Sequence, residues 1–229
     1  MGILNLTPDS FWEPGRGDTS ILESEYVDIV DIGAVSSRPG AADVEEQQEW
    51  ARLEPVLKNL TSQKAISIDT TSSKTVRKAY SLIGRFIVND ISAGTGDPEM
   101  LDTVAELGLG YVAMHKRGTP GNMDELCDYP DGVLAELQRY FEEFSTKAQR
   151  AGLGDWILDP GLGFAKTVEQ NFEILYNQDS LRVFGRPILL GPSHKRFTVG
   201  REDEVLRLCR TADIVRLHAD WAELFRKGV

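Results

Sequence analysis

The sequence predicts a compact (β/α)8 barrel, a fold of the α/β class, from three observations. Eight short apolar runs rich in β-prone residues follow one another along the chain, at residues 2–5, 27–33, 65–69, 86–90, 111–115, 156–160, 187–191 and 212–218. Mostly helical patterns separate these runs, as a parallel sheet covered on both faces requires. Eight is also the number of strands that closes such a barrel.

The segments between the runs predict helices of unequal length. Amphipathic helices are expected over 72–80, 98–107, 132–151 and 168–176, with Asp97 and Asp131 as N-caps of the second and third. The crossovers after the first and seventh runs offer only residues 19–26 and 202–210 for a helix, and the last candidate helix covers 221–227. A parallel crossover needs about a dozen residues in total, so shortened helices are expected after strands 1 and 7.

Composition limits the class of protein. The 229 residues fit one barrel domain over residues 1–229, and the 41% hydrophobic content suffices for a core. The net charge of −11 argues against nucleic acid or an anionic membrane as partners, and no apolar stretch reaches the roughly 18 residues of a membrane span. Cys127 and Cys209 lie far apart without metal-ligand spacing, as expected for two reduced thiols in a cytoplasmic protein.

Polar side chains gather at the ends of the eight runs. They are Asn5, Asp31, Asp69, Asn89, Asp90, His115, Asp159, Ser193, Lys195, Arg216 and His218. The active sites of (β/α)8 barrels lie where the strands end, so these residues predict an enzyme whose site is at that face.

Four cationic residues fall on neighbouring strands of the expected barrel. Arg38 follows the second run, Lys195 the seventh, and Arg216 and His218 end the eighth. Guanidinium and ammonium groups that converge in this way suit a phosphate or diphosphate. The alternative is that each is solvated charge at the barrel mouth.

An acidic and amide group ends strands 3, 4 and 6. Asp69, Asn89 and Asp159 are costly to bury unless hydrogen-bonded, and a heterocycle rich in N–H donors, such as a 2-amino-4-oxo-pyrimidine ring, would satisfy them. A glycosidase carboxylate pair, a metal site made by Asp69, Asp159 and His115, and strand capping are the alternatives. The glycine-bearing loop 159–166 can approach a ligand closely and stack Phe164 on an aromatic ring.

Eight motifs in chain order carry a resemblance to a known family. They are MGILNLTPDSF at 1–11, DIGAVSSRPGA at 31–41, SIDT at 67–70, VNDIS at 88–92, MHKRGTPGNM at 114–123, DPGLGFAKTVEQNF at 159–172, GPSHKRF at 191–197 and IVRLH at 214–218. The chain resembles the dihydropteroate synthases. Such enzymes join 6-hydroxymethyl-7,8-dihydropterin diphosphate to p-aminobenzoate, and release 7,8-dihydropteroate and diphosphate in folate biosynthesis.

The resemblance implies a role for each matching residue. The implied pterin-binding residues are Asp69, Asn89, Ile91, Met114, Asp159 and Lys195. The implied diphosphate-binding residues are Asn5, Arg38, Arg216 and His218, and Asn5 is also implied near a Mg²⁺ ion. The implied p-aminobenzoate side, where sulfonamides also bind, comprises Ser37, Arg38, Pro39, Phe164 and Ser193. The residues implied to carry the reaction are Asp69, Asp159, Lys195, Arg216 and His218. A homodimer through the C-terminal helices is implied as well.

The sequence departs from the family pattern at four positions. Val35 stands where many members have glutamate, His194 replaces an arginine, Arg196 a serine and Ala165 a glycine. Together with the short crossovers, these departures keep two alternatives open: a pterin-binding barrel without synthase activity, and a methyltransferase that binds methyltetrahydrofolate. The cationic residues argue against the second alternative, which has no need of a diphosphate site.

Overall fold

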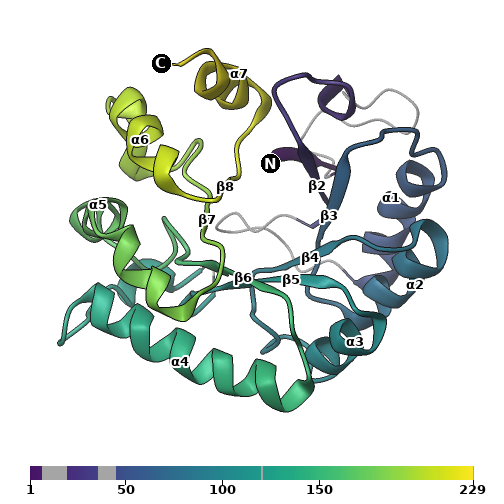
Figure 1. Cartoon of the computed structure of the whole chain (residues 1–229), viewed down its shortest axis with the longest axis horizontal. Helices are drawn as coiled ribbons and strands as arrows, with labels where there is room; N and C mark the ends of the chain where they lie inside the picture. Colours follow the sequence, from purple (N-terminus) through teal and green to yellow (C-terminus); the bar gives the residue numbers. More distant parts are fainter. Residues whose placement is uncertain (7–19, 36–44, 120, 229) are drawn as a thin grey trace.

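The computed structural model describes residues 1–6, 20–35, 45–119 and 121–228. Within these ranges, eight strands lie side by side around one axis (Figure 1). The strands are β1 (Gly2–Asn5), β2 (Ile29–Gly33), β3 (Ala65–Asp69), β4 (Ile87–Asp90), β5 (Gly110–Met114), β6 (Trp156–Asp159), β7 (Leu189–Leu190) and β8 (Ile214–Val215). All eight fall within the runs that the sequence predicts, or within one residue of them.

The strands form a closed parallel barrel. Strands β1 to β6 make one continuous sheet in chain order, and β7 and β8 make a second pair. Two single parallel bridges join the pair to the larger sheet, Leu158 to Ile188 and Gly2 to Leu217. The predicted (β/α)8 barrel is confirmed.

Helices surround the strands on the outside (Figure 1). They are α1 (Glu46–Lys58), α2 (Ser73–Ile83), α3 (Met100–Leu107), α4 (Val133–Ala151), α5 (Val168–Tyr176), α6 (Glu202–Leu208) and α7 (Ala219–Lys227). Five 3-10 segments accompany them in the described ranges: η2 (Ser20–Leu22), η3 (Met123–Glu125), η4 (Gln178–Phe184), η5 (Arg196–Thr198) and η6 (Cys209–Thr211). No helix in the described part of the chain is long and apolar enough to cross a membrane.

The short crossovers are observed, with one correction. After β7, the helix expected over 202–210 is present as α6 followed by η6. After β1, the helix expected over 19–26 is wrong in its described part, where only the three-residue turn η2 forms. Ser24 and Tyr26 sit in a turn instead, because the Ser24 hydroxyl accepts a hydrogen bond from the Tyr26 amide at 3.3 Å.

Two predicted helix caps are also wrong. Asp97 accepts hydrogen bonds from the Glu99 amide at 2.9 Å and from the amide of Ser73 at 2.8 Å, so it forms a turn before α3 and contacts the start of α2. Asp131 pairs with Arg139 at 2.9 Å, and Gly132 is the residue that precedes α4. Neither carboxylate accepts a hydrogen bond from an amide within the first turn of the helix that follows it.

Helix α4 packs an aromatic face against the barrel beneath the site. Phe141 and Phe144 are buried, and Phe144 meets Trp156 of β6 edge-on with ring centroids 5.0 Å apart. Tyr140 is half-buried and donates a hydrogen bond to the carbonyl of Met114, the last residue of β5, at 3.0 Å. The Tyr140 contact fixes the end of β5, where the site begins, and the Phe144 contact fixes the start of β6.

Candidate active site

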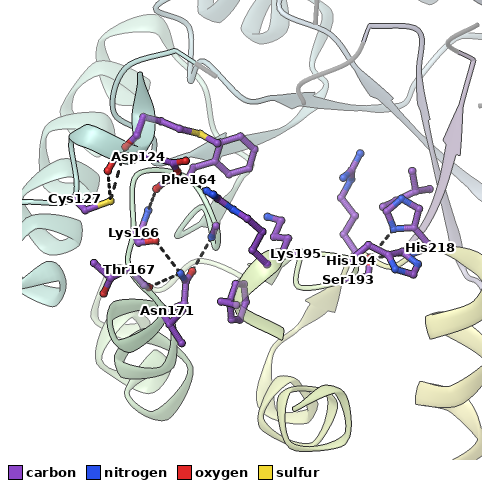
Figure 2. A pocket seen from close by; sticks show the side chains of 18 of the residues that line it. Asp124, Cys127, Phe164, Lys166, Thr167, Asn171, Ser193, His194, Lys195 and His218 are labelled. Atoms are coloured by element: carbon purple, nitrogen blue, oxygen red, sulfur yellow. Dashed lines mark hydrogen bonds and ion pairs between the residues drawn. The ribbon is translucent and has the colours of Figure 1, made fainter. Parts of the chain in front are cut away.

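A cavity of about 660 Å³ opens at the carboxyl ends of the strands. It is lined by residues of β1 and β3, by the loops after β6 and β7, and by the segment after β8. Figure 2 shows Ser193, His194 and His218 grouped on one side of the cavity, and Phe164, Lys166 and Asn171 on the other. This is the face at which barrel enzymes carry their active sites.

Arg216 joins two carboxylates across the barrel. Its Nε donates to Oδ2 of Asp31 at 2.6 Å, and its Nη2 donates to Oδ2 of Asp69 at 3.0 Å. The same Asp31 oxygen accepts a hydrogen bond from Nδ2 of Asn89 at 2.9 Å. Asp31 is fully buried, so its carboxylate needs a partner such as this guanidinium. The predicted phosphate-binding arginine and two of the predicted heterocycle-binding residues therefore form one network.

Burial changes the acidity of the carboxyls at the site. It raises the pKa of Asp69 to about 7, although Arg216 opposes the shift. Burial also raises the pKa of Asp159, with Lys195 opposing, while Oδ1 of Asp159 accepts a hydrogen bond from the Gly161 amide at 2.7 Å. A ligand that brings N–H donors or positive charge would favour the ionised form of either carboxyl.

Lys195 lies between these carboxyls and the aromatic wall. Its Nζ donates to the carbonyl of Leu162 and lies 4.7 Å from the centroid of the Phe164 ring. Burial lowers the pKa of Lys195 to about 8, although Asp159 favours the charged form. A cation over a ring face is favourable, so Lys195 and Phe164 support each other.

Ser193 and His218 form a pair on the opposite wall. The Ser193 hydroxyl lies 2.8 Å from Nδ1 of His218 and accepts a hydrogen bond from the His218 amide at 3.1 Å. The ring of His194 meets that of His218 edge-on at 4.7 Å, and His194 Nε2 lies 3.1 Å from Oδ1 of Asp220. The loop after β7 is thus tied to the segment after β8.

The structure brings seven of the eleven predicted site residues that it describes to this cavity. Those that line the cavity are Asn5, Asp69, Phe164, Ser193, Lys195, Arg216 and His218. Asn89, Ile91, Met114 and Asp159 lie outside its lining, and Asn89 reaches it through Asp31. Ser37, Arg38 and Pro39 lie outside the described residues.

Two residues at the site had no role assigned from the sequence. Asp31 was noted as a polar strand residue, yet its partners lie 58 and 185 residues away in the chain. Lys166 belongs to the glycine-bearing loop, and its ammonium turns inward to line the cavity. An aspartate inside an apolar strand is a signal that could have assigned Asp31, because a buried carboxylate needs a partner.

The alternative of a metal site made by Asp69, Asp159 and His115 is wrong. Among the described residues, no three His, Cys, Asp or Glu side chains are grouped so that they could hold a metal ion. The reason lies in their partners: Asp69 binds Arg216, Asp159 binds the Gly161 amide, and His115 faces the ammonium of Lys166.

Comparison with known proteins places this site in a class. The family described as pterin binding enzymes matches residues 1–219, and the chain belongs to that family of barrel enzymes. The dihydropteroate synthase of Synechocystis sp. is 38% identical, over 95% of this chain and 84% of that protein. The folic acid synthesis protein fol1 of Pneumocystis carinii is 41% identical over 86% of this chain, which spans only 29% of that longer protein.

The solved structures agree with the sequence relatives. The dihydropteroate synthase of Xanthomonas albilineans, solved with 4-aminobenzoic acid, superposes with a TM-score of 0.85 at 32% identity, covering 99% of this chain and 90% of that one. Within the pterin-binding family, the relatives of this chain are therefore dihydropteroate synthases, which are transferases.

Proposed function

We propose that this chain is a dihydropteroate synthase of folate biosynthesis. It would condense 6-hydroxymethyl-7,8-dihydropterin diphosphate with p-aminobenzoate, giving 7,8-dihydropteroate and diphosphate. The observation that carries the proposal is one cavity lined by cationic side chains and by the Asp69 carboxyl, with Arg216 bound to both Asp69 and the buried Asp31. The relative solved with 4-aminobenzoic acid supports the aromatic amine as the second substrate.

The chemistry asked of these residues is a displacement at the pterin methylene carbon. The carbon–oxygen bond to the diphosphate breaks, a carbon–nitrogen bond to the arylamine forms, and the amine loses a proton. Asp69 and Asp159 would hold the pterin ring through its N–H donors and stabilise positive charge at the methylene carbon. Lys195 would hold the ring from the other side, with Asn89, Ile91 and Met114 around it.

The leaving diphosphate needs positive charge around it. Arg216 and His218 line the cavity and supply donors there, and Arg38 would join them from outside the described residues. Phe164 and Ser193 line the same cavity and would position p-aminobenzoate, together with Ser37 and Pro39. Positioning and charge stabilisation, rather than proton transfer, would account for most of the rate.

A Mg²⁺ ion fits this scheme as a companion of the substrate. Mg²⁺ usually keeps several waters and binds one or two protein oxygens together with substrate phosphates, so it does not require a protein cage. Asn5 ends β1 and lines the cavity, where its amide oxygen could serve as such a ligand. The ion would supply charge neutralisation for the leaving diphosphate. The implied homodimer stays a prediction.

The test is dihydropteroate formation by the purified chain, given the pterin diphosphate, p-aminobenzoate and Mg²⁺, with a Mg²⁺-free control. Turnover that needs the ion is the expected result. A folded chain that binds pterin without turnover would favour the pterin-binding barrel without synthase activity. Methyl transfer from methyltetrahydrofolate would instead favour the methyltransferase.

A further inference from the structure

The loop between β6 and α5 has an unusual backbone. Gly161, Gly163 and Ala165 have φ angles of +68°, +77° and +49°, all in the left-handed region. A Cβ atom at Gly161 would lie 1.9 Å from the carbonyl oxygen of His115, so only glycine fits there. A backbone of this kind has no strand or helix ladder to satisfy its carbonyl groups, so most of their partners come from elsewhere; within the loop, the Phe164 amide donates to Gly161 O at 3.1 Å.

Side-chain donors bind four of the five carbonyls from 161 to 165. Nζ of Lys166 donates to Gly161 O at 3.0 Å and to Phe164 O at 2.9 Å. Lys195 donates to Leu162 O, and the Tyr129 hydroxyl donates to Ala165 O at 2.8 Å. Lys166 alone binds two of these four carbonyls, those of Gly161 and Phe164, and so draws both ends of the turn toward its ammonium group.

The third donor of Lys166 binds a buried histidine. Its Nζ lies 3.0 Å from Nδ1 of His115, so all three N–H groups of the ammonium have acceptors. His115 is 1% exposed, and burial, reinforced by Lys166, lowers its pKa to about 2. The imidazole is therefore neutral, with Nδ1 as the acceptor and the proton on Nε2.

His115 is itself held firmly against the barrel. Its ring meets that of Tyr140 edge-on at 4.8 Å, and its main-chain amide donates to Asp159 O at 2.9 Å. Nε2 lies 4.0 Å from Oε1 of Glu136, a carboxylate that also pairs with Arg117 at 2.7 Å. The backbone of His115 is thus positioned by β5 and β6, and Tyr140 of α4 packs against its ring.

The two ends of the loop carry two proposed substrate contacts. Phe164 faces the cavity, and its carbonyl binds Lys166 directly. Asp159 binds the amide of Gly161, whose carbonyl binds Lys166 in turn. The buried ammonium of Lys166 therefore connects Phe164, on the aromatic side of the cavity, to Asp159, the carboxyl that is proposed to hold the pterin.

We propose that Lys166, oriented by His115, is a positioning residue. It holds the 161–165 loop so that Phe164 faces the arylamine while Asp159 faces the pterin. This rests on the proposed function and adds a residue to it. Lys166 does not touch the reacting atoms in this scheme. Its effect is exerted through the carbonyls of Gly161 and Phe164, so it should act more strongly on the arylamine beside Phe164 than on the pterin.

The test compares Lys166→Met with Lys166→Arg. The matched control is Lys147→Met, a change at an exposed residue of α4. For folded K166M we expect kcat/KM to fall by about a hundredfold, the scale of a small misplacement at an active site. The KM for p-aminobenzoate should rise more than that for the pterin diphosphate. K166R should recover part of the loss because it keeps N–H donors, and K147M should match the unaltered enzyme.

Other outcomes of the comparison are equally decisive. Constants for folded K166M within twofold of the unaltered enzyme would overturn the proposal, and so would an equal rise in both KM values. If K166M does not fold, His115→Leu decides, because it leaves Lys166 in place and removes the Nδ1 acceptor. H115L should raise the KM for p-aminobenzoate and H115N, which offers an amide oxygen near that place, should raise it less; no difference between them would overturn the proposal.

Failure of the proposed function gives a different pattern. If the unaltered chain does not form dihydropteroate at all, the kinetic comparison is replaced by direct titration of p-aminobenzoate in the presence of pterin and diphosphate. Weaker binding by K166M and partial rescue by K166R would still support the positioning role. Equal binding by all three proteins would overturn it.

Discussion

The barrel has two unequal parts: the six strands β1–β6, and the two strands β7 and β8. Strands β1–β6 have four or five residues each in continuous parallel register, whereas β7 and β8 have two residues each and meet the larger sheet through single bridges. The acidic and amide residues Asp31, Asp69, Asn89 and Asp159 come from the six-strand part, and the cationic residues Lys195, Arg216 and His218 follow β7 and β8. The ion pairs of Arg216 therefore also hold the thinly paired part of the wall to the well-paired one.

The largest effect is expected from breaking that connection with Arg216→Ala. The variant leaves the fully buried Asp31 without its cation, so the free energy of unfolding should fall by about 3–5 kcal/mol. Affinity for the pterin diphosphate should fall far more than affinity for pterin alone. Denaturant unfolding and calorimetric titration measure both, with Arg150→Ala on exposed α4 as the control.

Two results would contradict the role of Arg216. One is a stability loss no larger than the roughly 0.5 kcal/mol typical of a surface substitution. The other is an equal loss of affinity for both ligands, which would remove Arg216 from the diphosphate site.

A smaller effect is expected from Asp69→Asn on the six-strand side. The pair between Arg216 and Asp31 survives this change, so stability should fall less than in R216A. Pterin affinity should fall by about tenfold to a hundredfold or more, as for the loss of a charge-assisted hydrogen bond. Titration with pterin measures it, and unchanged affinity would exclude Asp69 from the pterin pocket.

The two buried lysines predict a pH dependence of stability. Burial lowers the pKa of Lys166 to about 7 and that of Lys195 to about 8, both below the ordinary 10.5. Above pH 7 the unfolded chain therefore binds more protons at these two groups than the folded chain, and their contribution to the unfolding free energy should rise from about pH 7 to 10. Denaturant unfolding at pH 7 and pH 9 measures the change, and Lys195→Met should reduce it. The same slope in K195M would contradict the assignment.

The smallest effect is a difference in local opening between the two parts. The amides of Ile214 and Arg216 bond across β7 and β8 at 3.0 and 2.8 Å, yet these strands have little further pairing. Native-state hydrogen exchange should therefore be faster there than at Ile68 in the middle of β3. A ligand that binds Arg216 should reduce this difference in exchange rate. Equal protection of the two parts without ligand would show that they open together.

Most of the fold could be predicted from the sequence because strand signals are local. Each apolar run is short, and β3, which lies between two neighbours of the same sheet, has exactly the predicted bounds. The errors concern side chains with distant partners. Asp97 binds Ser73 and Asp131 binds Arg139, so neither caps the helix that follows it in the chain.

The residues of the site could be predicted to a similar degree. The prediction missed contacts between side chains that are far apart in the chain, as it did for the fold. Strand ends identified Asp69, Lys195, Arg216 and His218, which line one cavity. The sequence does not show which carboxylate Arg216 binds, because that depends on closure of the barrel. Ala165, which departs from the family glycine, adopts a left-handed φ of +49°, a conformation that glycine adopts more readily.

The Oδ2 atom of Asp31 couples the binding of the two ends of the first substrate, the pterin ring and the diphosphate. Oδ2 accepts from the Asn89 amide and from the Arg216 guanidinium at once. A diphosphate that draws Arg216 away from Asp31 strengthens the bond from Asn89 to Asp31, so Asn89 becomes less available to a pterin. Separate pterin and diphosphate fragments should therefore weaken each other's binding, and by thermodynamic reciprocity the two factors must be equal.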